Sequence, residues 1–121
     1  MAVILIIEDH QDMREMFKML LEHMGHQVEV AREGVEGLHQ LQRRPDLVLL
    51  DLSMPMASGD VVLGYIRSTP DLAHTKVLVI SALPNADQIS VQLGADACLK
   101  KPADLSDVRK LVNQLLDEAR A

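Results

Sequence analysis

Five short apolar runs alternate along this chain with longer stretches whose apolar residues recur at helical spacing. The runs predict β-strands at about residues 2–7, 27–31, 46–50, 76–81 and 96–99. Four of them are continuous, as in strands buried on both faces, whereas 27–31 alternates polar and apolar residues and is expected at a sheet edge. Strands that alternate with helices favour a parallel sheet covered on both faces. The sequence therefore predicts an α/β fold built on a doubly wound, five-stranded parallel sheet.

Five helices are expected between and after these strands. The first is the clearest, because its apolar residues recur at the spacing of one helix face. These residues are Met13, Phe17, Leu20, Leu21 and Met24. Shorter patterns of the same kind span 35–41, 61–66, 86–93 and 105–115. Gly25 and Gly94 are suited to end helices, and Pro45 and Pro70 stop the helices before them, so residues 1–121 are expected to form one domain.

Composition excludes several classes of protein. The chain has 121 residues, 48% hydrophobic and 25% charged, a balance typical of a globular domain with a real core. Its net charge of −6 disfavours nucleic acid and anionic lipid as direct partners. No stretch approaches the ~20 apolar residues that span a bilayer, so no membrane partner is expected. The single cysteine, Cys98, rules out an internal disulfide, and we expect a cytoplasmic domain.

Polar side chains stand at the ends of four of the expected strands. Glu8 and Asp9 follow the first strand, and Asp51 follows the third. Ser81 ends the fourth strand, and Lys101 follows the fifth. In open parallel sheets, functional sites lie at the carboxyl ends of the strands. We therefore expect an acid pair, a third carboxylate, a hydroxyl and an amine to meet at one edge of the sheet.

These groups together suit a divalent metal and a phosphoryl group. Three carboxylates within a few ångströms raise one another's pKa values, and a hard cation such as Mg²⁺ relieves that repulsion. Asp51 has two candidate roles, as a metal ligand and as a nucleophile that accepts a phosphoryl group. Lys101 and Ser81 can each hold a phosphoryl oxygen. Each residue alone has an ordinary explanation, such as a solvated loop or a surface lysine, and only their combination supports the site.

Four motifs in fixed order carry a resemblance to a known family. They are Ile6-Ile7-Glu8-Asp9, Leu50-Asp51-Leu52-Ser53-Met54-Pro55 with Gly59, Val79-Ile80-Ser81-Ala82, and Gly94-Ala95-Asp96 through Lys101-Pro102. Their key positions are 42, 30 and 20 residues apart (9 to 51, 51 to 81 and 81 to 101). In these motifs and spacings the chain resembles, from end to end, the receiver domains of two-component response regulators, including single-domain chemotaxis-type regulators.

The resemblance implies the flavodoxin-like strand order 2-1-3-4-5 and a metal site. Asp9 and Asp51 would bind Mg²⁺ directly, with Mn²⁺ as an alternative ion. The backbone carbonyl of Ser53 would be the third protein ligand, and Glu8 would act through water.

The resemblance also implies how a phosphoryl group would be handled. Asp51 would be the phosphoacceptor. Lys101 would pair with the phosphoryl group, and Ser81 would hydrogen-bond it after moving inward. Ala82 is small and would leave an approach for a phosphodonor or water, and the peptide bond between Lys101 and Pro102 would be cis.

In this interpretation the chain is a signalling switch and not an enzyme beyond self-catalysed phosphotransfer and slow autodephosphorylation. It would take its phosphoryl group from a phosphohistidine of a sensor kinase or of a histidine phosphotransfer protein. The added charge would change a partner-binding face formed by residues 85–116. The target would be a downstream protein or a fused output domain, and the sequence leaves open whether the chain stands alone.

Two positions depart from the family pattern. Cys98 stands where the family usually has Tyr or Phe, a ring that turns inward as the Ser or Thr moves toward phosphate. Ala57 stands where a larger apolar residue is common. Neither residue takes part in the phosphorylation chemistry. We therefore expect both to affect how phosphorylation changes the partner-binding face. Met54 and Met56, in the loop after Asp51, could border the pocket.

Two other functions use parts of this pattern. A Mg²⁺-dependent aspartyl-phosphate phosphatase would need its nucleophile after the first strand, with a second Asp two residues on. Here Gln11 stands two residues after Asp9, and Ser53 stands two residues after Asp51. A flavodoxin-like nucleotide binder would need a Gly-rich or Ser/Thr-rich phosphate loop after the first strand, where the acidic segment 8–12 would repel phosphate. Both fit less well than a signalling switch.

Overall fold

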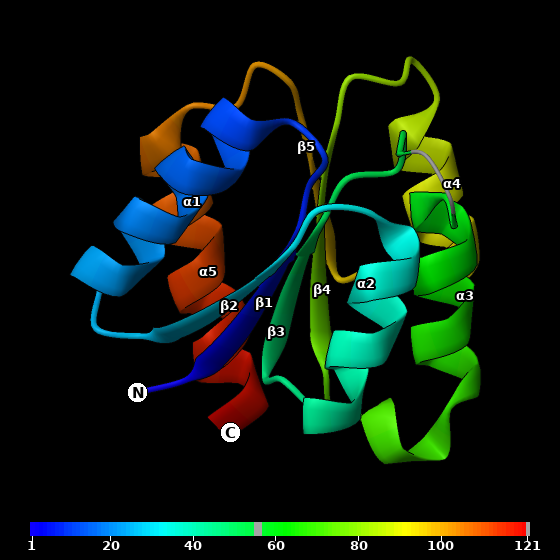
Figure 1. Cartoon of the computed structure of the whole chain (residues 1–121), viewed down its shortest axis with the longest axis horizontal. Helices are drawn as coiled ribbons and strands as arrows, with labels where there is room; N and C mark the ends of the chain where they lie inside the picture. The colour runs from blue at the N-terminus through cyan, green and yellow to red at the C-terminus, as the bar shows by residue number, and fades with distance from the viewer. Residues whose placement is uncertain (55–56, 121) are drawn as a thin grey trace.

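Residues 1–54 and 57–120 are described by a computed structural model of the chain (Figure 1). Its strands are β1 (Val3–Ile7), β2 (Gln27–Ala31), β3 (Leu47–Leu50), β4 (Lys76–Ser81) and β5 (Ala97–Lys100). Its helices are α1 (Gln11–His23), α2 (Gly34–Gln40), α3 (Gly59–Ser68), α4 (Ala86–Leu93) and α5 (Leu105–Arg120), with 3₁₀ turns η1 (Leu41–Arg43) and η2 (Pro70–Leu72). Every predicted strand is present, with ends within one residue of those expected. None of the described helices is long and apolar enough to span a membrane.

The strands form one parallel sheet in the order β2-β1-β3-β4-β5. This confirms the flavodoxin-like arrangement and the edge position predicted for β2. Ile7 at the end of β1 is paired with Ala31 on one side and with Leu50 on the other. Leu50 is in turn paired with Val79 of β4. Strands β1 and β3 therefore end level with each other, and the residues after them emerge side by side.

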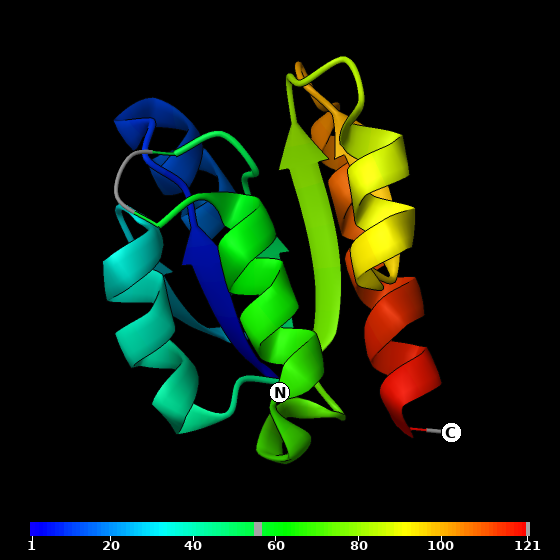
Figure 2. The ribbon, with the colours of Figure 1, turned by 90° about the vertical axis from the view of Figure 1, so that its right-hand side faces the viewer.

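Helices cover both faces of the sheet, as Figures 1 and 2 show. Helices α1 and α5 pack on one face, and α2, α3 and α4 pack on the other. Successive residues of a strand point to opposite faces, so each central strand contributes to two cores. Ile6 packs in one core with Phe17 and Val112, and Ile7 packs in the other with Leu63. The doubly wound fold is thus confirmed.

Two expectations about burial are wrong. The continuous apolar run of β5 indicated burial on both faces, but β5 lies at the second edge of the sheet and its residues 97–99 are only half-buried. In α3, Val61 and Tyr65 belong to the apolar pattern yet are 55% and 45% exposed, whereas Val62 and Ile66 are buried. Five of the six residues from 61 to 66 are apolar, so spacing alone did not select the buried face.

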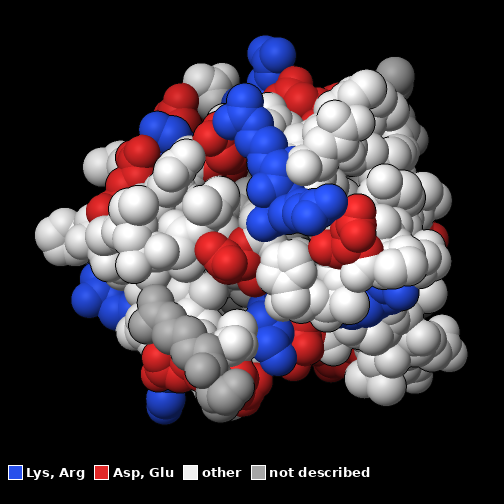
Figure 3. All heavy atoms as spheres, turned by 90° about the horizontal axis from the view of Figure 1, so that it is seen from below, with Lys and Arg blue, Asp and Glu red and all other residues white. Residues whose placement is uncertain are grey.

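Charged side chains tie the elements together at the edge where the strands begin. Arg67, near the end of α3, donates to the carbonyl oxygens of Thr75 (2.8 Å) and Gly94 (2.7 Å) and to the carboxylate of Asp96 (2.7 Å). Nζ of Lys76 lies 3.8 Å from Asp96 on the other side. Figure 3 views the molecule from this end and shows basic and acidic side chains intermixed over the face. These contacts hold α3 against the starts of β4 and β5, at the edge opposite the candidate site.

Candidate functional site

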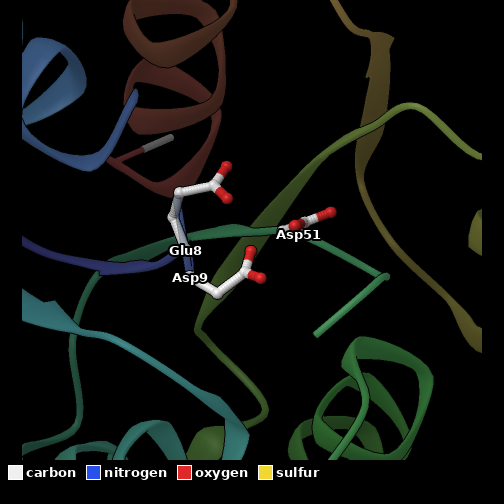
Figure 4. A group of neighbouring side chains, drawn as sticks. All are labelled: Glu8, Asp9 and Asp51. Carbon is white, nitrogen blue, oxygen red and sulfur yellow. The ribbon is translucent and has the colours of Figure 1, made fainter. Parts of the chain in front are cut away.

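All five polar residues from the strand ends lie at the carboxyl edge of the sheet. Glu8 and Asp9 follow β1, Asp51 follows β3, Ser81 is the last residue of β4, and Lys101 follows β5. One carboxylate oxygen from each of the three acidic residues lies within 4.8 Å of the others (Figure 4). The fold therefore brings the three carboxylates together and places Ser81 and Lys101 at the same edge of the sheet.

The ammonium group of Lys101 holds two of these carboxylates. Its Nζ lies 2.8 Å from Oε1 of Glu8 and 3.4 Å from Oδ2 of Asp51. Only 2% of the Glu8 side chain, 5% of Asp51 and 14% of Lys101 are exposed. The peptide bond between Lys101 and Pro102 is cis, as expected. The lysine offsets part of the repulsion within the acidic cluster.

Burial dominates the protonation of this cluster. It is the largest effect on Glu8 and Asp51 and raises both pKa values above their ordinary values, although contacts with Lys101 lower them; repulsion from Asp51 adds to the rise at Glu8. Burial also opposes the charge on Lys101, but the ion pairs with the two carboxylates outweigh it and raise the pKa of Lys101 overall. With Asp9 added, three carboxylates face one ammonium group. A hard divalent cation such as Mg²⁺ fits this excess of negative charge and these oxygen donors.

Two backbone hydrogen bonds fix Asp51. Its N–H donates to the carbonyl oxygen of Ile7 (3.1 Å), which extends the pairing of β1 and β3 beyond the strands. The N–H of Ser53 donates to Oδ1 of Asp51 (3.2 Å). The two carboxylate oxygens are therefore distinct, because Oδ1 is held by the loop and Oδ2 lies beside Lys101.

A hollow of about 530 Å³ gives access to the cluster. Residues that line it and belong to the predicted site are Asp9, Asp51, Ser53, Ala82 and Lys101. Met54, which could have bordered the pocket, packs instead against the core beneath α3 and α4. Pro55 of the third-strand motif and Met56 lie outside the described residues.

Ser81 is fully buried, and its hydroxyl is already engaged. Its Oγ accepts a hydrogen bond from the N–H of Leu83 (3.2 Å), so it holds the loop that leads from β4 into α4. The N–H of Lys101 donates to the carbonyl oxygen of Ser81 (3.0 Å), which ties the ends of β4 and β5 together. Ser81 thus contacts both the backbone of Lys101 and the loop that leads into α4.

Several residues at the start of α1 line the hollow or contact the acid pair but were not predicted as part of the candidate site. His10, Gln11 and Met13 line the same hollow. Nδ1 of His10 accepts the N–H of Met13 (3.4 Å) and so caps α1. Arg14 hydrogen-bonds the backbone that precedes the helix. Their sequence position could have indicated this, because α1 begins only two residues after Asp9 and its first turns must lie beside the acid pair.

Both departures from the family pattern lie in the described part of the chain. Cys98 is half-buried on β5 and packs against the core on the α4 side, and this burial raises the pKa of its thiol. The backbone of Ala57 lies so close to the start of α2 that a side chain at Gly34 would overlap the carbonyl group of Ala57. The loop after Asp51 therefore touches α2 directly.

Replacing Asp51 with Asn should stabilise the metal-free protein at neutral pH. Burial raises the folded-state pKa of Asp51 above its unfolded value, so the folded state loses stability as the pH rises through the interval between the two. The amide removes this penalty but also loses the attraction to Lys101. We expect a net gain on the order of 1 kcal/mol at pH 7, measured by urea unfolding in EDTA. The gain should shrink as the pH falls toward the ordinary range of Asp.

Asp71→Asn is the matched control for this measurement. Asp71 is 69% exposed and pairs with Arg44 at the other edge of the sheet. Its substitution should change the unfolding free energy little. A gain in Asp71→Asn equal to that in Asp51→Asn would contradict an origin in the buried cluster.

Comparison with known sequences matches residues 4–113 to the response regulator receiver domain. The chain is 33% identical to the sensor histidine kinase TmoS of Ectopseudomonas mendocina, over 93% of this chain and 12% of that protein. It is 34% identical to the response regulator MprA of Mycobacterium leprae, over 93% of this chain and 50% of that protein. The chain thus spans half or less of the length of these relatives.

Solved structures agree with the sequence match. A CheY-like receiver domain protein of Methanospirillum hungatei has a TM-score of 0.92 at 26% identity, covering 99% of this chain and 97% of that one. The receiver domain of a signal transduction histidine kinase from Syntrophus aciditrophicus has a TM-score of 0.90 at 32% identity, covering 98% and 92%. With its sheet order, its acidic cluster and these matches, the chain belongs to the response regulator receiver domain family of two-component systems.

Proposed function

We propose that this chain is a phosphorylatable signalling switch that accepts a phosphoryl group on Asp51 with the help of Mg²⁺. The observation that carries the proposal is the cluster of three carboxylates within 4.8 Å, with Nζ of Lys101 3.4 Å from Oδ2 of Asp51. A nucleophile, a cation site and a fixed positive charge are the parts that phosphoryl transfer to a carboxylate needs. Membership of the receiver domain family supports the same role.

The donor would be a phosphohistidine on a sensor kinase or on a histidine phosphotransfer protein. A carboxylate oxygen of Asp51 bonds to phosphorus as the phosphorus–nitrogen bond of the donor breaks. The imidazole leaves with the electron pair of that bond and takes a proton from solvent, and the product is an aspartyl phosphate. Lys101 balances the charge of the transferred oxygens as a point charge. The small side chain of Ala82 at the rim leaves room for the donor.

Glu8, Asp9 and Asp51, with the carbonyl oxygen of Ser53, would hold the Mg²⁺, and Mn²⁺ is the alternative ion. When bound, the ion supplies charge neutralisation for the phosphoryl oxygens. The contacts of Glu8 support an indirect role for it. Its Oε1 is paired with Lys101 (2.8 Å), and its Oε2 accepts the N–H of His10 (3.2 Å). Oδ2 of Asp51 lies farther from Nζ of Lys101 (3.4 Å) than Oε1 of Glu8 does (2.8 Å), so Asp51 would give up an oxygen to the ion more readily than Glu8.

Ser81 would link phosphorylation of Asp51 to a change in the loop before α4. Its Oγ accepts the N–H of Leu83 in this structure, and a phosphoryl oxygen on Asp51 would accept the Ser81 O–H and draw the hydroxyl away from Leu83. That movement would break the bond from Leu83 and release the loop that enters α4 at Ala86. The roughly 1.5–2 negative charges and three acceptor oxygens of a phosphoryl group are enough to bias a two-state loop. The face formed by residues 85–116 would then change its affinity for a partner.

We further propose that residues 1–121 act as one receiver domain, a regulatory phosphoacceptor and not a turnover enzyme. Its output would be a downstream protein or a fused output domain. Direct nucleic acid or membrane binding by this domain is not part of the proposal. Because histidine kinases use ATP, the proposal also places the domain in the cytoplasm.

Acetyl phosphate with Mg²⁺ should add one phosphoryl group to the chain, because a small donor can enter the hollow without a kinase. Intact-mass spectrometry would detect the adduct, and hydroxylamine should remove it, as expected for an acyl phosphate. Excess EDTA should reduce the adduct to background, since the acidic cluster then keeps its full negative charge. Equal labelling in EDTA would contradict the role of the metal.

A further inference from the structure

The side chain of Arg14 turns back from α1 toward the acid pair. Its Nη1 donates to the carbonyl oxygen of Glu8 at 3.0 Å and to that of Asp9 at 3.3 Å. Both carbonyls lie beyond the end of β1 at Ile7. One nitrogen of the guanidinium group therefore binds two successive carbonyl oxygens of the segment that carries the acidic side chains.

This bridge bears on the geometry of the acid pair. In an extended strand, successive side chains and successive carbonyls point in opposite directions. Here the carboxylates of Glu8 and Asp9 both reach within 4.8 Å of Asp51. Two neighbouring carbonyls that share one donor must converge, so the backbone at Glu8 and Asp9 departs from the extended form. That departure is what allows both acidic side chains to serve one site.

The positive charge of Arg14 opposes the binding of a second cation beside it. It is the fourth residue of α1, close to the helix end whose dipole repels cations. It also lies next to a cluster proposed to bind a divalent cation. For Mg²⁺ binding, electrostatics alone would favour a neutral residue here, so any benefit of Arg14 to the metal site comes from its hydrogen-bond geometry.

We propose that Arg14 is a positioning residue that holds Glu8 and Asp9 in the conformation required for metal binding. The proposal rests on the function proposed above, because it concerns the same Mg²⁺ site. A positioning role and a purely electrostatic role for Arg14 predict opposite changes in Mg²⁺ affinity when the arginine is replaced. Loss of a positive charge alone would strengthen Mg²⁺ binding, whereas loss of the bridge would weaken it.

The test is calorimetric titration of Mg²⁺ into the full chain and its variants. Arg14→Met keeps the apolar stem but removes both hydrogen bonds, and we expect about tenfold weaker binding. Arg14→Lys keeps a donor that can reach both carbonyls, and we expect binding within about threefold of the wild type. The unfolding temperature of each metal-free variant, measured in EDTA, separates loss of geometry from loss of fold.

Arg32→Met is the matched control. Arg32 follows β2 at the same edge of the sheet, is 71% exposed and pairs with Glu36. It removes the same charge without touching the acid pair, so Mg²⁺ affinity should stay equal or rise slightly.

The outcomes separate this inference from the proposed function. If the wild type binds no Mg²⁺, the proposed function fails. If the wild type binds and Arg14→Met binds as tightly or more tightly, the positioning role is overturned while the proposed function stands. Equal weakening in Arg14→Met and Arg14→Lys, with equal loss of unfolding temperature, also overturns it, because the arginine would then serve the fold alone.

Discussion

Asp51→Asn should abolish phosphoryl uptake from acetyl phosphate, with a loss of at least about 100-fold in the rate of labelling. A carboxamide is not a nucleophile of this kind and forms no acyl phosphate. Its shape matches the carboxylate, so the hydrogen bond from the Ser53 N–H can be kept and the fold preserved. The measurement is the fraction of phosphorylated chain by intact mass after a fixed reaction time with Mg²⁺.

A control variant tests whether Asp51, and not another carboxylate, accepts the phosphoryl group. Asp71→Asn removes an exposed carboxylate at the other edge of the sheet and should be labelled like the wild type. Equal labelling of Asp51→Asn would sink the assignment of Asp51. Peptide mapping would then turn to Asp9, which follows the first strand, the position where the alternative phosphatase class carries its nucleophile.

Gly59→Ala should lose about 3 kcal/mol of unfolding free energy and should also slow phosphoryl uptake. Gly59 is the first residue of α3, and a Cβ there would overlap the carbonyl group of Asp51 and the Cα of Leu52. Both are backbone atoms, so relief requires the start of α3 or the segment after β3 to move. The N–H of Gly59 donates to the carbonyl oxygen of Leu52 (3.0 Å), and that bond would be strained as well. Urea unfolding and the acetyl phosphate assay measure the two effects.

Gly64→Ala, in the same helix, should behave oppositely. A Cβ at Gly64 meets no atom within 4 Å, so the substitution only improves helix propensity. We expect a gain of about 0.5–1 kcal/mol in unfolding free energy and unchanged phosphoryl uptake.

Equal stability of Gly59→Ala and the wild type would show that the close approach to Asp51 is not a constraint on the sequence.

Most of the fold could be predicted because the sequence features that specify each helix and strand lie within that element or next to it. Strand lengths, helix breaks at Gly25 and Gly94, and the alternation in β2 all follow from side-chain burial along short segments. The half-burial of β5 was not predictable from its own residues. Its apolar run looks like that of a strand buried on both faces, although the strand order implied by the family resemblance already placed it at an edge.

The candidate site was predictable in membership but not in its contacts. The strand-end rule selects Glu8, Asp9, Asp51, Ser81 and Lys101 from the sequence. It does not show that Nζ of Lys101 lies closer to Glu8 than to Asp51, because that depends on how three strand ends and their loops pack. Nor does it find Arg14, whose contact with the acid pair is made by a helix side chain turning back on the backbone.

By itself, the sequence determined which chemical groups stand at the carboxyl edge, since a parallel sheet with helical crossovers sends every strand end to the same side. Tertiary structure alone decided the direction of their pKa shifts and their interaction partners. Burial raises the pKa values of Glu8 and Asp51, and one ammonium group is shared between them. Desolvation and distance are properties of packing, and no spacing along the chain encodes them.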